Sequence, residues 1–257
     1  MFRTLLASAC LALLSGQASA ALTSGDLAFT AFNADEDGWA MTTFVDIAAD
    51  TTIFFSDNEW NGSSFNSGES FHSWHTGNNA ISAGTVIRFS NIDQAGRSVS
   101  VGTLSGSGSN FGISATSETL YAYLGSDYST PGIFLTAISS EGDVNIVPTG
   151  LSAGVNAVVL TDSSDYAEYI GPRSGLSEFA DYAALVNDAA NWSILVGGDQ
   201  SLQTPDTASF SVAPASVPLP GTIWLFGSVC AGLAAMRSHN SRLIVKASDR
   251  CVASAGR

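Results

Sequence analysis

Short apolar and aromatic runs, separated by turn-forming Gly, Ser, Asn and Asp, recur along most of this chain. Runs of this length that are rich in β-branched and aromatic residues are typical of β-strands. The predicted strands cover residues 27–32, 39–47, 51–55, 70–76, 85–89, 120–124, 133–138, 156–160 and 192–196. Long helical stretches between them, which a parallel sheet needs for its crossovers, are nearly absent. The pattern therefore predicts a mainly β domain, an antiparallel β-sandwich with one short helix.

The predicted helix covers residues 177–186, an Ala-rich stretch. Its apolar side chains recur at helical spacing and fall on one stripe: Leu176, Phe179, Ala183 and Val186. Ser177 is the expected N-cap, because a hydroxyl there accepts a bond from a free backbone N–H.

Glycines mark the predicted turns. Gly84 and Gly154 each follow a Ser-Ala pair and precede an apolar run, so we expect both to relieve backbone strain in a tight turn. The stretch at residues 106–109 alternates Gly and Ser and is predicted to be a flexible turn.

The N-terminus has the composition of a secretory signal. Arg3 precedes an apolar stretch that is too short to cross a bilayer. Ala18, Ser19 and Ala20 then form a small-residue cleavage pattern. We therefore expect cleavage between Ala20 and Ala21 and export of the rest of the chain.

The C-terminus contains an apolar run at residues 221–236, followed by Arg237 and Arg242. It predicts a transmembrane helix whose arginines remain on the cytoplasmic side. The stretch before it is rich in Pro, Ser, Thr and Ala and suits an extended linker. The predicted order is a signal peptide (1–20), a β-sandwich-like domain (21–203), a linker (204–216), a sorting and transmembrane segment (217–242) and a tail (243–257).

Cysteine and charge both set the central domain apart. Cys10, Cys230 and Cys251 all lie in the terminal segments, so no disulfide can form within the domain. Between residues 21 and 217 there are 22 carboxylates and three arginines, which leaves a net charge of about −19. Such a field repels nucleic acid and anionic lipid surfaces and attracts cations. We therefore expect no nucleic-acid partner.

The C-terminal segment resembles the PEP-CTERM sorting signal. The residues that carry the resemblance are Val217, Pro218, Leu219 and Pro220, then Trp224-Leu225-Phe226-Gly227-Ser228 within the apolar run, and the arginines that follow. The arginines are dispersed, and 15 residues follow Arg242. The resemblance implies an exosortase partner in a Gram-negative, exopolysaccharide-producing bacterium. It also implies an inner-membrane intermediate, cleavage near Val217-Pro218-Leu219-Pro220, and delivery to the cell surface or extracellular matrix. The alternative is a plain membrane anchor.

The central domain is vaguely similar to lamin-tail-like β-sandwiches and to domains of bacterial surface proteins. The similarity rests on residues 25–35, on residues 51–60 with their Phe-Ser-Asp-Asn-Glu-Trp ending, and on Asn191-Trp192 after the helix. It implies no enzymatic activity.

Asp35, Glu36 and Asp37 form an acidic turn before Gly38 and are the candidate calcium ligands, with Asp57 and Glu59 as possible additions. Hard cations prefer oxygen ligands, which an acidic turn supplies as carboxylates and carbonyls. The spacing is not that of an EF-hand, and the alternative is an acidic hairpin turn. No other cofactor is expected.

The remaining candidates are weaker. His72 and His75 are three apart on a predicted strand, so we expect them on opposite faces, as solvent-exposed polar residues and not as a zinc site. Six aromatic residues between 54 and 74 suit either a core or a sugar-stacking surface: Phe54, Phe55, Trp60, Phe65, Phe71 and Trp74. The central domain contains no cysteine and no phosphate-binding loop motif.

Two functions follow from these observations. The preferred one is a non-enzymatic surface or matrix protein, released into or held within exopolysaccharide. The alternative is a secreted glycan-active hydrolase or carbohydrate-binding protein that uses a pair of carboxylates such as Asp57 and Glu59.

Overall fold

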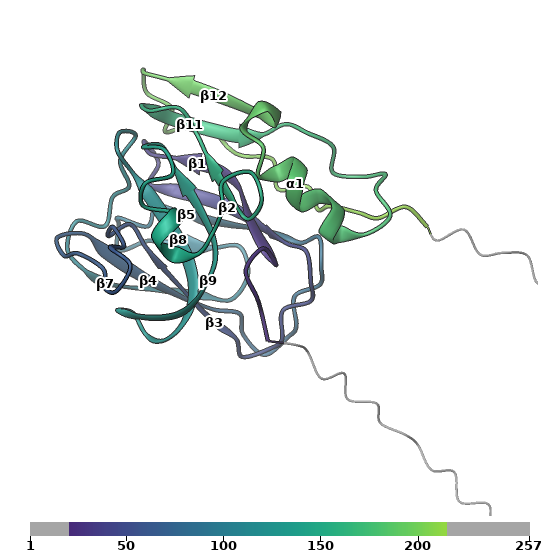
Figure 1. Cartoon of the computed structure of the whole chain (residues 1–257), viewed down its shortest axis with the longest axis horizontal. Coiled ribbons are helices and arrows are strands. Elements are labelled where there is room, and N and C mark those ends of the chain that lie inside the picture. Colours follow the sequence, from purple (N-terminus) through teal and green to yellow (C-terminus); the bar gives the residue numbers. More distant parts are fainter. Residues whose placement is uncertain (1–20, 215–257) are drawn as a thin grey trace, which may run out of the picture. The chain divides into compact units, whose positions relative to one another are not determined.

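The computed structural model describes residues 21–214, and the strands of that region form two six-stranded sheets (Figure 1). The first sheet has the order β12-β11-β1-β2-β5-β6. Its strands are β1 (Leu27–Asn33), β2 (Gly38–Thr43), β5 (Val86–Ser90), β6 (Ser98–Val99), β11 (Ser164–Tyr169) and β12 (Trp192–Val196).

The second sheet has the order β10-β9-β8-β3-β4-β7. Its strands are β3 (Thr52–Ser56), β4 (Ser70–His75), β7 (Thr103–Gly108), β8 (Thr119–Asp127), β9 (Thr130–Ser139) and β10 (Ala157–Val159). All neighbouring strands in both sheets are antiparallel except β9 and β10, which are parallel. The predicted mainly β class is therefore confirmed, with a mixed second sheet.

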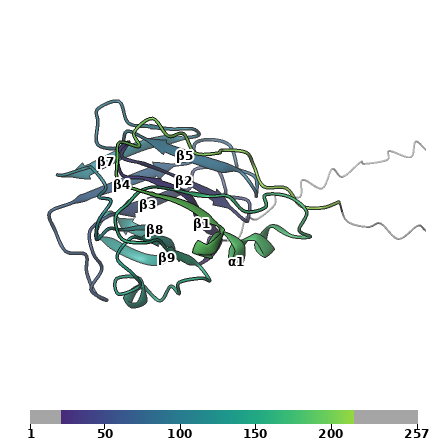
Figure 2. The same cartoon turned by 90° about the horizontal axis from the view of Figure 1, so that it is seen from above.

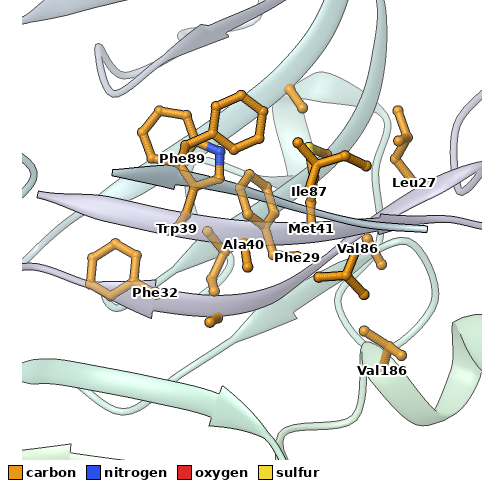
Figure 3. Packing of buried hydrophobic residues seen from close by; sticks show 14 of the residues in the cluster. Leu27, Phe29, Phe32, Trp39, Ala40, Met41, Val86, Ile87, Phe89 and Val186 are labelled. Atoms are coloured by element: carbon orange, nitrogen blue, oxygen red, sulfur yellow. The ribbon is translucent and has the colours of Figure 1, made fainter. Parts of the chain in front are cut away.

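The two sheets pack face to face through aromatic side chains. The ring of Trp39 on β2 lies 5.0 Å from that of Phe89 and 5.1 Å from that of Phe55 on the other sheet. Trp74 contacts Phe89 edge-on at 5.4 Å. Figure 3 shows Trp39 and Phe89 side by side, with Phe29, Met41 and Ile87 continuing the apolar layer. This layer is the main hydrophobic core, and it contains no disulfide.

Strands β1 and β2 are buried along their whole length, so both faces of the first sheet are covered there. One face meets the second sheet. Helix α1 (Ala183–Val186) packs against β1, and Figures 1 and 2 show it beside the strands of this sheet. Tyr182, Val186 and Trp192 belong to the same core cluster.

The predicted helix is shorter than its sequence pattern suggests. A 3-10 turn, η2 (Phe179–Tyr182), leads into the four-residue α1. Glu178, not Ser177, is the N-cap, because Glu178 and Asp181 form a reciprocal capping box. Two further 3-10 turns are η1 (Val147–Thr149) and η3 (Ala189–Asn191).

Three strands escaped the sequence prediction. The Gly-Ser stretch predicted as a flexible turn lies largely in β7, where it pairs with β4 along its length. The backbone partners supplied by β4 outweigh the weak strand propensity of Gly and Ser. The short β6 and the charged β11 also lack the apolar run on which the prediction depended. Gly84 and Gly154 do have positive φ angles, as expected, of 83° and 79°.

The predicted linker, residues 204–216, begins too early. The chain remains docked on the domain until Ala213, whose N–H donates to the carbonyl of Leu176. Phe210 is 3% exposed and packs among the rings of Phe44, Tyr169 and Tyr182. We call residues 204–213 the C-terminal strap. It completes the core, so it belongs to the folded domain.

Arg173 fixes the strap through three contacts. Its guanidinium lies 5.0 Å from the ring centre of Phe210, donates to the carbonyl of Ala208 and forms an ion pair with Asp206 at 3.4 Å. The strap is therefore fixed by burial, by hydrogen bonds and by charge together.

No helix among residues 21–214 is long and apolar enough to cross a membrane. The predicted signal peptide and the predicted C-terminal transmembrane segment lie outside the described residues.

Replacing Phe210 with Ala should lower the free energy of unfolding by about 3–5 kcal/mol, because it empties a closed aromatic site. Urea unfolding measures the loss. Leu202→Ala is the matched control, since Leu202 is 94% exposed in the preceding turn and should change stability by less than about 0.5 kcal/mol. Equal urea midpoints for the two variants would contradict the assignment of the strap to the core.

Candidate functional site

Three carboxylates meet at one end of the second sheet. Asp57 directly follows β3, Glu69 directly precedes β4, and Glu118 directly precedes β8. Strand β3 lies between β4 and β8 and is antiparallel to both, so the end of β3 adjoins the beginnings of its two neighbours. Each of the three residues offers an oxygen within 4.8 Å of the others. We call them the carboxylate cluster.

Backbone and hydroxyl donors fix two members of the cluster. Asp57, 2% exposed, accepts bonds from the Ser70 N–H at 2.9 Å and the Ser70 hydroxyl at 3.1 Å. Glu118, 4% exposed, accepts from the N–H of Ser114 at 2.7 Å. Oε2 of Glu69 is buried and has no hydrogen-bond partner within residues 21–214. The cluster therefore contains one buried hydrogen-bond acceptor, Oε2 of Glu69, for which the described residues supply no donor.

Burial and repulsion from neighbouring carboxylates raise the pKa of all three groups. Loss of solvation is the largest cause, and it raises the pKa of Asp57 to about 6, that of Glu69 to about 7 and that of Glu118 to about 9. The negative charge of Asp57 adds to the increase at both Glu69 and Glu118. At neutral pH the cluster therefore favours retaining a proton or taking up a cation. Its three oxygens are the described ligand set best placed for a metal ion.

A serine, a histidine and an aspartate also meet here, in an order that differs from a catalytic triad. Nε2 of His72 lies 3.1 Å from the Ser70 hydroxyl, but Asp57 bonds to Ser70 and not to His72. Nδ1 of His72 is buried without a partner among the described residues. In a triad the carboxylate would hold that nitrogen. Among the described residues the carboxylate–histidine contact of a triad is therefore absent, and Asp57 bonds to Ser70 instead.

The sequence prediction for the two histidines is half right. They do project to opposite faces of β4, but His72 is only 1% exposed and is not a surface residue. Burial lowers the pKa of His72 to about 3, and the nearby positive charge of Arg97 adds to this, so its ring is neutral. His75 lies on the other face, 3.9 Å from Asp50.

The predicted calcium ligands occupy one turn but use their carboxylates separately. Asp35 accepts from the N–H of Gln200 at 2.6 Å, and Glu36 bonds to Arg88 at 2.6 Å. Asp37 accepts from the N–H of Ile113 at 2.8 Å, and burial raises its pKa to about 6. The three residues thus share one turn, but each carboxylate bonds to a different residue of the protein.

Asp57 and Glu59, named as a possible carboxylate pair, have different partners in the structure. Asp57 joins the carboxylate cluster, whereas Glu59 bonds to the side-chain amide of Asn66. The sequence signal for the cluster was the position of each acid at a strand end. To predict the cluster from this signal, one must also know that β8 lies beside β3. The sequence pattern does not give the order of strands in a sheet.

The six aromatic residues between positions 54 and 74 divide between two places. Phe55 and Trp74 lie in the main core. The others gather on the outer face of the second sheet, around Tyr121, Tyr123 and Phe134: these are Phe54, Trp60, Phe65 and Phe71.

Comparison of the chain with protein-family models, with curated proteins and with solved structures finds no match. The site must therefore be interpreted from its own chemistry.

Stability should fall as pH rises from about 5 to 8. The folded cluster holds protons that the unfolded chain, with carboxyl pKa values near 4, has already lost, and each such proton contributes a slope of about 1.4 kcal/mol per pH unit. Glu118→Gln removes the ionisable group whose pKa is raised furthest, so the slope should become shallower. Thermal melts across this pH range measure it.

The control for this experiment is Asp162→Asn, a change at an exposed turn residue that should leave the slope unaltered. A Glu118→Gln variant that retains the full pH dependence would contradict the assigned protonation.

The sequence-based calcium prediction can be tested on the same protein. If the turn at residues 35–37 binds calcium, millimolar calcium should raise the melting temperature through ligand linkage. Asp35→Asn with Asp37→Asn should then abolish the increase, and Glu69→Gln should retain it. The reverse pattern would move the cation to the carboxylate cluster, and no increase in the unmodified protein would refute the prediction.

Proposed function

We propose that this chain is an exported, non-enzymatic protein of the cell surface or the exopolysaccharide matrix, sorted by a C-terminal PEP-CTERM signal. In this proposal the signal peptide directs export, the tail holds the chain in the inner membrane, and an exosortase cleaves near Val217-Pro218-Leu219-Pro220.

The proposal rests on where the folded domain begins and ends relative to the two predicted cleavage points. Leu22, two residues after Ala20, is 4% exposed in the core. Ala213, four residues before Val217, makes the last backbone bond of the strap. Cleavage at both predicted points would therefore release one folded unit and leave its core intact.

The negative charge of the surface supports a location of the domain outside the cell. All three arginines of the domain are engaged by the protein itself: Arg88 pairs with Glu36, Arg97 lies over Phe111, and Arg173 holds the strap. The many carboxylates therefore give the surface a strongly anionic character. Such a surface remains hydrated and resists self-association.

Burial of the reactive groups supports a non-enzymatic role. A glycosidase places its two carboxyls on either side of a sugar ring. Here Asp57 and Glu118 are almost fully buried, and Glu69 is the more accessible member of the cluster. Turnover of a glycan that is lost on Glu69→Gln would support the hydrolase alternative.

Replacing Pro218 and Pro220 with Ala should block processing in an exosortase-bearing Gram-negative host, and the full-length protein should accumulate in the inner membrane. The two prolines lack backbone donors, which favours an extended segment accessible to an enzyme. Membrane fractionation and immunoblotting measure the outcome.

The matched control replaces Pro205, which lies within the folded domain, with Ala; processing should persist. Released unmodified protein should begin at Ala21 by N-terminal sequencing. Normal shortening and release of the Pro218→Ala, Pro220→Ala variant would show that the segment is only an anchor.

A further inference from the structure

The outer face of the second sheet carries aromatic and hydroxyl side chains across three strands, with Asp50 beside His75 at one end. Side chains on this face of β4 are Phe71, Ser73 and His75, since His72 and Trp74 point into the core. The strand register pairs Phe71 with Ser107 and Ser73 with Ser105, and paired residues share a face. Strands β3, β4 and β7 contain no Asp, Glu, Lys or Arg.

Aromatic rings form one half of this surface. Phe54 and Phe71 are half-buried, and the half-exposed ring of Tyr128 lies 5.4 Å and 6.3 Å from them. The Tyr128 hydroxyl lies 3.1 Å from that of Ser73, so the ring is held in place. Phe65 extends the row, 5.6 Å from Phe71.

Hydroxyl groups form the other half. Thr103, Ser105 and Ser107 are all exposed on β7, the edge strand of the sheet. They are two residues apart, and neighbouring strands lie about 4.8 Å apart. Thr103, Ser105 and Ser107 therefore form a row of small hydroxyls beside the row of aromatic rings, and we call this row the hydroxyl shelf.

We infer that this aromatic and hydroxyl face binds a neutral polysaccharide. Sugar rings present C–H groups that stack on aromatic faces and hydroxyls that exchange hydrogen bonds with Ser and Thr, and this face offers both side by side. The inference rests on the proposed export into a polysaccharide matrix and specifies how the domain would be retained there.

Charge selects the kind of glycan. An anionic polysaccharide would approach a domain with 22 carboxylates whose three arginines are already engaged. Its association would therefore be opposed by repulsion. A neutral chain meets no such barrier, and on these three strands it desolvates no carboxylate.

The test is co-sedimentation of the purified protein with two insoluble neutral glucans, cellulose and curdlan, and with calcium alginate beads as the anionic probe. Ser105→Glu with Ser107→Glu places two hydrated charges on the shelf without altering the core. The matched control is Ser98→Glu with Ser193→Glu, two exposed positions on edge strands of the first sheet. Melting temperatures show whether each variant is folded.

We expect the unmodified protein to bind a neutral glucan but not alginate. The shelf variant should lose at least tenfold in affinity, while the control retains it. Tyr128→Ser should weaken binding as well. Equal losses in the shelf variant and the control, preference for alginate, or no binding to either glucan would overturn the inference. Export and tail processing are measured separately, so failure here leaves the sorting result unaffected.

Discussion

The contact of Trp39 with Phe55 and Phe89 joins the two sheets, and the rest of the domain depends on it. The body has no cysteine, so no covalent link supplements this packing. The ring nitrogen of Trp39 has no hydrogen-bond partner among the described residues, which is a cost of burying so large a side chain. Aromatic area therefore outweighs a polar penalty at the centre of the fold.

The carboxylate cluster adds a second cost at the edge of the same core. Three acidic groups are held together where strand ends converge, and Ser70 and Ser114 supply the donors that make burial of two of them tolerable. Proton uptake offsets the remaining repulsion. At this sheet end the raised pKa values favour partly neutral acids, whereas the acids on the outer surface keep the protein hydrated.

Periodicity revealed much of the fold because most strands carry apolar or aromatic runs. The predicted last strand, residues 192–196, coincides with β12, and the mainly β class is confirmed. Strand β7 could not be predicted, since its Gly and Ser side chains say nothing of the partner that β4 provides. The strap was hidden for a similar reason: its prolines indicate a linker, while Phe210 is buried by residues far away in sequence. The carboxylate cluster could not be predicted, because it depends on the order of the strands in the sheet. The strand pattern alone leaves that order open.

The position of Phe210 also affects when the domain can fold. Among residues 21–214 it is the last residue of the main core, and its N–H bonds to the carbonyl of Gly84, far earlier in the sequence. Contacts between such distant residues form slowly, because a long loop must close before they contribute. A nascent chain that has emerged only as far as β12 still lacks this ring and leaves Phe44, Tyr169 and Tyr182 without their partner. Completion of the core therefore waits for nearly the whole domain to emerge, which keeps the chain incompletely folded during synthesis.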